Sequence, residues 1–364
     1  MIEQRYPAGY AYEARFADLR AVGGGEGCVV YAGTDGGRPV LVTDESTAAD
    51  LAGDDDLLAR AVCVRTFASG GERARYFQTL MRHLTPLPDP AAGESGPSGG
   101  GVHLSKRGFV IRTPDDWLLF APPKAPEAHW VAGRSALECA VAWCGGPEGP
   151  AVPAEIAALL DSHPDTRRCT LTAATPEHPI AFDELPGEPR NADVAAQGKD
   201  ARGALALTVE AKADEPFDRR VADVLAEAVD RAAHGERTNI VRRVEQLAAA
   251  LLPPARRGLP GLGELRYQLL TGAAGTLAYA ATVGAGRAVL VVHEFVTPAT
   301  RDERHRTNAA DLDAFVRRLS GGDTGGIPPD RLAGPFRVPG GPLFARPAAL
   351  YVGKVQRWLR APGA

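Results

Sequence analysis

The sequence predicts an α/β (α+β) protein in which a mixed sheet flanked by helices follows a small α+β domain. After residue 126, segments of helical periodicity alternate with short apolar runs in the order helix, strands, helices, strand. The run Ala288–Val292 contains no polar residue, as is typical of a strand buried on both faces. The segment 86–101 is too rich in proline, glycine and serine to pack, which predicts a flexible loop.

These observations predict two domains. At 364 residues the chain is long enough for two sizeable cores, and 45% hydrophobic with 24% charged residues is ordinary for a globular protein. We expect an N-terminal α+β domain of unknown role over 1–125, which contains the loop 86–101. The second domain is expected over 126–364, with a C-terminal extension at 321–364.

In the first domain, alternation and turn residues predict strands, and longer periodicity predicts one helix. Strands are expected at 27–31 and 39–43 around the turn 35–37, with a helix at 72–84. Thr113-Pro-Asp-Asp116 lies between two apolar runs, 109–112 and 117–120, and predicts a hairpin turn.

The second domain is expected to begin with a helix, because Ser135 and Glu138 have the spacing of a capping box ahead of an apolar stripe. Further helices are predicted at 153–160, 218–233, 239–252 and 263–283. Strands are predicted at 169–173, 180–182, 192–196, 204–212 and 288–292. Residues 350–358 are expected to return to the core as a strand or helix, with Trp358 buried.

Charge is distributed unevenly along the chain. Residues 1–200 hold 18 Lys+Arg and 28 Asp+Glu, whereas residues 201–364 hold 23 and 17. The second half is therefore the half that suits phosphate, and its arginine pairs, such as Arg242-Arg243, fit contact with a nucleic-acid backbone. The alternative reading of each pair is a solvated helix face.

The sequence offers no sign of a membrane protein. No run approaches the roughly 18 consecutive apolar residues of a membrane span, and the first residues lack the basic and apolar regions of a signal peptide. We expect a cytoplasmic protein with no membrane partner.

The chemically richest pattern lies at the end of the apolar run 204–212. Side chains alternate along a strand, so Glu210 and Lys212 point to the same side. The other residues on that side are small, which leaves room, and Asp193 lies in a neighbouring run close enough to pair. Two converging carboxylates can hold Mg²⁺ through oxygen ligands, with a lysine to orient or deprotonate water. The alternative is a solvated Glu–Lys pair.

Asn191-Ala-Asp193, Val209-Glu-Ala-Lys212 and the preceding helix at 135–143 together resemble the PD-(D/E)xK nuclease superfamily. The extension through Phe217 and the segment Leu265–Leu270 look like a group of uncharacterised bacterial proteins assigned to that fold. The resemblance covers about residues 126–320. It implies a restriction endonuclease-like fold: a helix, strands that carry the acid and (D/E)xK residues, a helix and a further strand.

The resemblance also implies roles for individual residues. Asp193 and Glu210 would bind Mg²⁺ or Mn²⁺, and Lys212 would position or activate water. Glu138 would take the place of the acid that many members supply from the first helix, although a cap also explains it. Arg266 and Gln268, near the start of a later helix, would contact phosphate or form an ordinary surface pair. Apart from the resemblance, His293 and Glu294 on the last strand of this core suggest another acid and base, but strand-end polar residues usually meet solvent, and we expect these two to do so.

The function that the resemblance implies is metal-dependent hydrolysis of phosphodiester bonds, most plausibly in DNA and in defence against foreign DNA. The acidic N-terminal domain would bind a protein partner or select substrate, and a homodimer would cut both strands. Two alternatives stay open. One is a catalytically silent module of the same fold that binds nucleic acid or assembles with a partner, and the other is a metal-dependent activity on a small phosphorylated substrate.

Overall fold

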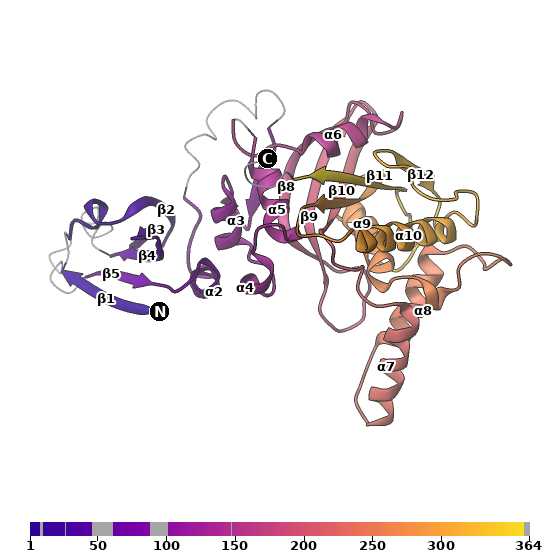
Figure 1. Ribbon diagram of the computed structural model, residues 1–364, viewed down its shortest axis with the longest axis horizontal. Coiled ribbons are helices and arrows are strands. Elements are labelled where there is room, and N and C mark those ends of the chain that lie inside the picture. Colours follow the sequence, from indigo (N-terminus) through magenta and orange to yellow (C-terminus); the bar gives the residue numbers. More distant parts are fainter. Residues whose placement is uncertain (8–9, 26, 46–60, 88–100, 147, 360–364) are drawn as a thin grey trace. The chain divides into compact units, whose positions relative to one another are not determined.

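The chain is α+β, as predicted, and forms two compact units in the computed structural model (Figure 1). The structure describes residues 1–7, 10–25, 27–45, 61–87, 101–146 and 148–359. One unit comprises residues 1–99 and 103–130, and the other comprises 100–102 and 131–364. Most of the loop predicted over 86–101 lies outside the described residues.

The first unit is built on an antiparallel five-stranded sheet with the order β1-β5-β4-β3-β2. Its strands are β1 (Ile2–Pro7), β2 (Ala17–Gly25), β3 (Cys28–Asp35), β4 (Arg38–Asp44) and β5 (Ala61–Thr66). A short 3₁₀ turn, η1 (Tyr12–Ala14), precedes β2. The remaining elements are helix α2 (Gly70–Leu80), the hairpin β6 (His103–Lys106) and β7 (Phe109–Val110), and helices α3 (Pro114–Phe120) and α4 (Pro126–His129).

The hairpin predicted around Thr113 is wrong, because this residue begins helix α3. The Thr113 side chain accepts a hydrogen bond from the Asp116 amide at 3.1 Å, and Asp116 Oδ2 accepts one from the Thr113 amide at 3.0 Å. Pro114 occupies the first turn, where its missing N–H costs nothing. A threonine and an aspartate three residues apart therefore cap a helix here.

The second unit alternates helices and strands. Its helices are α5 (Ser135–Cys144), α6 (Ala154–Asp161), α7 (Val221–Ala233), α8 (Ile240–Leu251), α9 (Tyr267–Thr282) and α10 (Asp302–Leu319), with a 3₁₀ turn η3 (Leu262–Glu264). Its strands are β8 (Thr170–Ile180), β9 (Arg190–Asp200), β10 (Gly203–Lys212), β11 (Arg287–Val296), β12 (Leu332–Phe336) and β13 (Ala349–Trp358).

These strands lie in the order β12-β13-β11-β10-β9-β8. Strands β8, β9 and β10 form an antiparallel meander, whereas β10, β11 and β13 run parallel. Mixed pairing of this kind places the carboxyl ends of β10, β11 and β13 at one edge of the sheet. The predicted order of helix, strands, helices and strand is present, with α5 and α6 first, then β8 to β10, then α7 to α9, and then β11.

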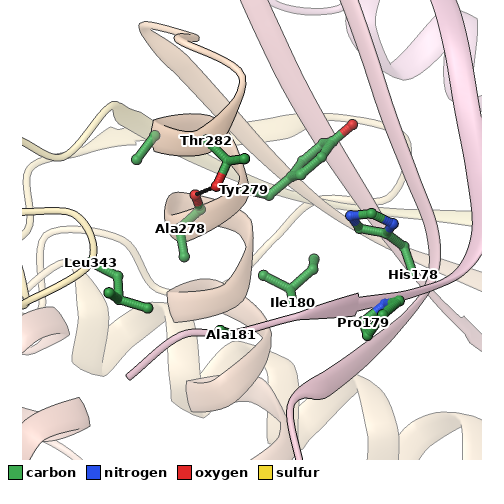
Figure 2. Close-up of a pocket in the computed structure, with 9 residues that line it drawn as sticks. His178, Pro179, Ile180, Ala181, Ala278, Tyr279, Thr282 and Leu343 are labelled. Atoms are coloured by element: carbon green, nitrogen blue, oxygen red, sulfur yellow. Dashed lines mark hydrogen bonds between the residues drawn. The ribbon is translucent and has the colours of Figure 1, made fainter. Parts of the chain in front are cut away.

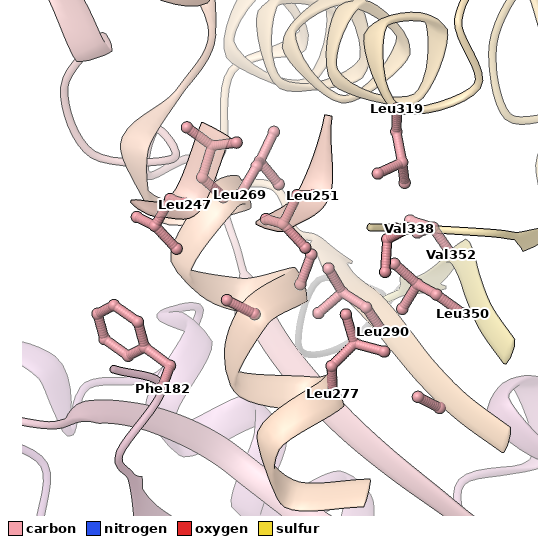
Figure 3. Close-up of a cluster of buried hydrophobic side chains, with 14 of the residues drawn as sticks. Phe182, Leu247, Leu251, Leu269, Leu277, Leu290, Leu319, Val338, Leu350 and Val352 are labelled. Atoms are coloured by element: carbon pink, nitrogen blue, oxygen red, sulfur yellow. The ribbon is translucent and has the colours of Figure 1, made fainter. Parts of the chain in front are cut away.

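Helix α9 packs on the sheet and forms the centre of the main apolar core (Figure 3). Its Leu277 lies among side chains of the parallel strands, including Leu290 and Leu350. Alanine and glycine dominate its buried positions, which lets the helix approach the sheet closely. Thr276 Oγ1 lies 2.5 Å from Thr208 Oγ1 of β10. The small residues that precede Glu210 on this side of β10 therefore accommodate α9.

Three further predictions need correction. The strands predicted at 169–173 and 180–182 form the single strand β8, whose pairing with β9 continues past Pro176 and Pro179 although a proline lacks an N–H. Trp358 is 72% exposed, because it lies where β13 leaves the sheet. Helix α10 was not predicted. Its arginine-rich start hid an apolar stripe that includes Leu312, Phe315 and Leu319.

Candidate active site

The end of β10 holds the predicted Glu210 and Lys212 beside one another. Lys212 Nζ lies 3.3 Å from Glu210 Oε1, and both residues are buried, with 7% and 4% of their surface exposed. At this degree of burial, the two side chains cannot be solvated as a surface pair would be. The alternative of a solvated Glu–Lys pair is therefore wrong.

Asp193 of β9 joins this pair. Its Oδ2 accepts a hydrogen bond from the backbone N–H of Ala211 at 2.7 Å. Burial raises the pKa of Asp193 to about 7, and the nearby charge of Glu210 adds to that rise, while Lys212 and Arg190 oppose it. The structure thus places the half-buried Asp193 beside the buried pair of Glu210 and Lys212.

Two more side chains donate to Glu210. Arg190 Nη2, from the start of β9, donates to Oε2, and Gln268 Nε2, from the first turn of α9, donates to Oε1. Gln268 was predicted as a phosphate contact, and here its amide holds the carboxylate. Arg190 was missed by the sequence analysis. The available signal was an arginine three residues before Asp193, at the head of a run that is otherwise mostly apolar.

Glu138 lies in the first turn of α5, but the predicted capping box is wrong. The helix begins after Arg134, and no side chain caps it. Glu138 Oε1 instead accepts the backbone N–H of Gly133 at 2.6 Å, while Ser135 Oγ donates to Glu215 Oε1 at 3.1 Å. Its place as a third acid therefore stays a prediction.

Arg266 precedes α9, and its guanidinium is already paired with other residues of the chain. Its Nε lies 2.8 Å from Asp311 Oδ2, and its Nη1 donates to the Asp218 carbonyl at 2.9 Å. Among the predicted arginine pairs, Arg243 Nε likewise lies 2.5 Å from Asp183 Oδ2. Internal carboxylates neutralise these two arginines, so neither presents a free charge at the surface.

A metal at this site would have few protein ligands. Among the described residues, no group of three or more His, Cys, Asp or Glu side chains is placed to hold an ion. Asp193 and Glu210 are hard oxygen donors, and Mg²⁺ commonly binds through one or two carboxylates with water and phosphate oxygens completing the shell. The donor set fits such an ion, and a cation beside Asp193 would oppose the rise in its pKa that burial and the charge of Glu210 cause.

His293 and Glu294 of β11 do not meet solvent, contrary to expectation, since both are 0% exposed. His293 Nε2 lies 2.7 Å from Glu155 Oε1 of α6, which Arg357 also contacts. Burial lowers the pKa of His293, although Glu155 acts in the opposite direction. The histidine is thus fixed in an internal ion-pair cluster.

Glu294 is held by β13. Its Oε2 lies 2.8 Å from Lys354 Nζ and accepts a hydrogen bond from Gln356 Nε2 at 2.6 Å. Lys212 is aligned with Glu294 in the parallel pairing of β10 and β11. The carboxyl ends of the three parallel strands therefore carry a continuous row of polar groups, of which Lys212 and Glu294 are buried.

A separate depression of about 390 Å³ lies near the other end of α9 (Figure 2). His178 and Tyr279 stand on its wall with ring centroids 5.4 Å apart, and Ile180 and Leu343 supply apolar surface. None of the predicted site residues lines it. The chemistry-bearing cluster and this depression are therefore distinct features.

A family model described as a domain of unknown function (DUF6946) matches residues 110–350. No curated protein and no solved structure matches the chain. None of the described helices is long and apolar enough to cross a membrane.

Proposed function

This chain belongs to the DUF6946 family, and we propose that it is a metal-dependent nuclease that hydrolyses phosphodiester bonds in DNA. The observation that carries the proposal is the convergence of Asp193 with the buried Glu210 and Lys212 at the end of a central strand. The elements α5, β8 to β10, α9 and β11 follow the order that the resemblance to PD-(D/E)xK nucleases implies, with α6 inserted after α5 and with α7 and α8 inserted before α9. This order supports the same reading.

Asp193 and Glu210 would hold Mg²⁺ or Mn²⁺, with Glu138 as the proposed additional acid. The ion would stabilise negative charge that develops on the phosphate. The Ala211 amide holds Asp193 and Gln268 holds Glu210, which limits how far either carboxylate can turn. An ion at Glu210 would still have to displace Arg190 from that carboxylate.

Lys212 would orient the attacking water. Its Nζ is a compact point charge with three donors, and the aromatic ring of Phe217 lies beneath it, 5.5 Å from Nζ to ring centroid. The ring restricts the ammonium group to the side of Glu210. Water bound between this ammonium group and a phosphate would be held close to its target.

The wider roles of the protein follow by analogy with nucleases of this fold. We propose a cytoplasmic protein that acts against foreign DNA and dimerises to cut both strands. The first unit, 1–99 with 103–130, would select substrate or bind a protein partner.

One observation favours a catalytically silent module instead. Arg190, Lys212 and Gln268 already contact Glu210, so its carboxylate is fully engaged without any metal. A site that had lost turnover could keep such an arrangement as a structural core. In that case the protein would bind nucleic acid, or a partner, without cleavage.

Incubation of the purified chain with supercoiled, linear and single-stranded DNA, and with RNA, tests the proposal. Parallel reactions contain Mg²⁺, Mn²⁺ or EDTA. We expect cleavage that requires the metal and is lost in Asp193→Ala and Lys212→Ala. Cleavage that survives both substitutions would come from another site or a contaminant, and binding without cleavage would favour the silent module.

A further inference from the structure

Arg190 is buried, yet most of its hydrogen-bonding capacity is unused. Only 8% of its surface is exposed, and its Nη2 donates to Glu210 Oε2. Within the described residues, its Nε and Nη1 have no hydrogen-bond partner. Buried N–H groups are normally hydrogen-bonded. A donor that gives up its hydrogen bonds to water and finds no protein partner lowers the stability of the fold. This guanidinium therefore has free donors beside the proposed metal ligands.

Two glycines of helix α9 leave space for the Arg190 side chain. A Cβ added at Gly275 would lie 3.1 Å from Arg190 Cδ, and one added at Gly272 would lie 3.5 Å from Arg190 Nη2. Two glycines in a helix interior are unfavourable, so their use here fits close approach of a large side chain. The side chain is packed along its stem while its donors stay unpaired.

The charges in the cluster point to a second partner for Arg190. Asp193 and Glu210, when ionised, balance Arg190 and Lys212, so the cluster is formally neutral. A divalent cation would bring two additional positive charges into a buried site. An anion must then enter with it, since uncompensated buried charge is strongly disfavoured. A phosphodiester is such an anion, and a guanidinium is the side chain best suited to its oxygens.

We propose that Arg190 exchanges partners. It neutralises Glu210 while no cation is bound, and it donates to a nonbridging phosphate oxygen of the substrate once a divalent cation holds that carboxylate. This inference rests on the proposed nuclease function and assigns a phosphate-binding residue to the same site. Arg190 therefore competes with the metal for Glu210, and after the metal displaces it, Arg190 binds the substrate phosphate.

These two roles predict opposite effects of one substitution. In Arg190→Gln, Mn²⁺ measured by electron paramagnetic resonance at pH 8 should bind about 10-fold more tightly, because a competing cation is gone. A fluorescein-labelled DNA duplex, measured by anisotropy with Ca²⁺ as the metal, should bind about 10-fold more weakly, because a phosphate contact is lost. A purely structural role would shift both affinities in the same direction, or neither, and either result would overturn the assignment.

Arg287→Gln is the matched control. Arg287 is a similarly buried arginine of the same sheet that pairs with Asp200. We expect both affinities to stay within about 2-fold of the wild type, since distant sites act independently. An equal response in Arg287→Gln would show that any lost arginine has these effects, which would also overturn the assignment.

Arg190→Lys covers the case in which Arg190→Gln does not fold. It retains the charge and loses the planar fork, so metal affinity should stay near the wild-type value while DNA binding weakens. Unchanged DNA binding in a folded Arg190→Lys would overturn the inference. The proposed function fails separately: a wild-type chain that binds neither Mn²⁺ nor DNA loses both proposals, whereas one that binds and cleaves normally can still lose only the role of Arg190.

Discussion

Two buried arginine–carboxylate pairs lie near opposite ends of β10, and they differ in how well the arginine is satisfied. At the start of β10, Arg287 forms two hydrogen bonds of 2.8 Å with the two oxygens of Asp200. The same two nitrogens also donate to the carbonyls of Gly203 and Asp165. This pair is bidentate and complete at both terminal nitrogens, which is the geometry of a structural ion pair.

At the other end of β10, Arg190 makes one hydrogen bond to Glu210, and its other two nitrogens have no partner in the part of the chain that the structure describes. Glu210 lies beside Asp193 and Lys212, so this arginine faces a second acid and a second base. The contrast teaches that burial alone does not identify function. The incomplete pair leaves buried donors without partners among the described residues, and a ligand at this end of β10 would satisfy them.

The largest expected difference between the two ends is in activity. Glu210→Gln removes a proposed metal ligand and should lower DNA cleavage by about 1000-fold or more. Asp200→Asn changes the acid of the complete pair and should leave cleavage of the folded protein near the wild-type rate. Rates of plasmid nicking under saturating Mg²⁺ measure both, and equal losses would contradict a functional distinction between the ends.

For thermal stability we expect the opposite order: the pair of Arg287 and Asp200 should matter more than the pair of Arg190 and Glu210. Arg287→Gln leaves Asp200 without its bidentate partner and should lower the thermal midpoint by about 5 °C. Arg190→Gln should cost less, because it removes two unpaired donors together with the charge. Differential scanning calorimetry of both variants decides this. A larger loss for Arg190→Gln would mean that its ion pair is the main structural one.

The glycines of α9 offer a finer test of the incomplete pair. Gly275→Ala would push on Arg190 Cδ from 3.1 Å, whereas Gly272→Ala would make ordinary contacts of 3.5 Å or more. Both changes favour the helix by about 1 kcal/mol. We expect Gly272→Ala to raise the thermal midpoint, and Gly275→Ala to gain less and to weaken DNA binding about 2-fold to 3-fold. Identical behaviour of the two variants would show that α9 does not position Arg190.

Local sequence patterns were enough to predict the acid and base of β10 and the order of the main elements. The two-residue period of a strand places Glu210 and Lys212 on one side, and no distant contact changes that. The partners of Glu210 could not be predicted in the same way. They depend on how β9 is offset from β10 and on where α9 crosses the sheet, which are properties of tertiary packing.

The same division explains the errors. Thr113 and Asp116 suit both a turn and a helix cap, and only the packing of the following apolar residues decides between them. His293 and Glu294 look like solvent-facing residues at a strand end. Their burial depends on Glu155 and Lys354, which lie far away in sequence. Polar residues whose partners are distant are therefore the ones that sequence analysis most easily misreads.

A third polar cluster, formed by His293, Glu155 and Arg357, lies beside the functional end of β10. We expect this cluster to be structural, so that the functional end of the sheet does not include it. Burial would raise the pKa of Glu155, but hydrogen bonds from His293 and Arg357 outweigh it and lower that pKa from 4.5 to about 2. A carboxyl whose pKa is lower in the folded protein stabilises it above the unfolded value. That contribution is lost as the pH falls from about 4.5 towards 2.

Glu155→Gln should therefore destabilise the protein near neutral pH, and the difference from the wild type should shrink as the pH falls through this window. Urea unfolding of both proteins at several pH values measures the difference in their free energies of unfolding. Groups that titrate in both proteins cancel in this difference. DNA cleavage by folded Glu155→Gln should stay within about 2-fold of the wild type. A large loss of cleavage would place His293 and Glu155 in the active site, and the functional end of the sheet would then extend beyond β9 and β10 to β11 and α6.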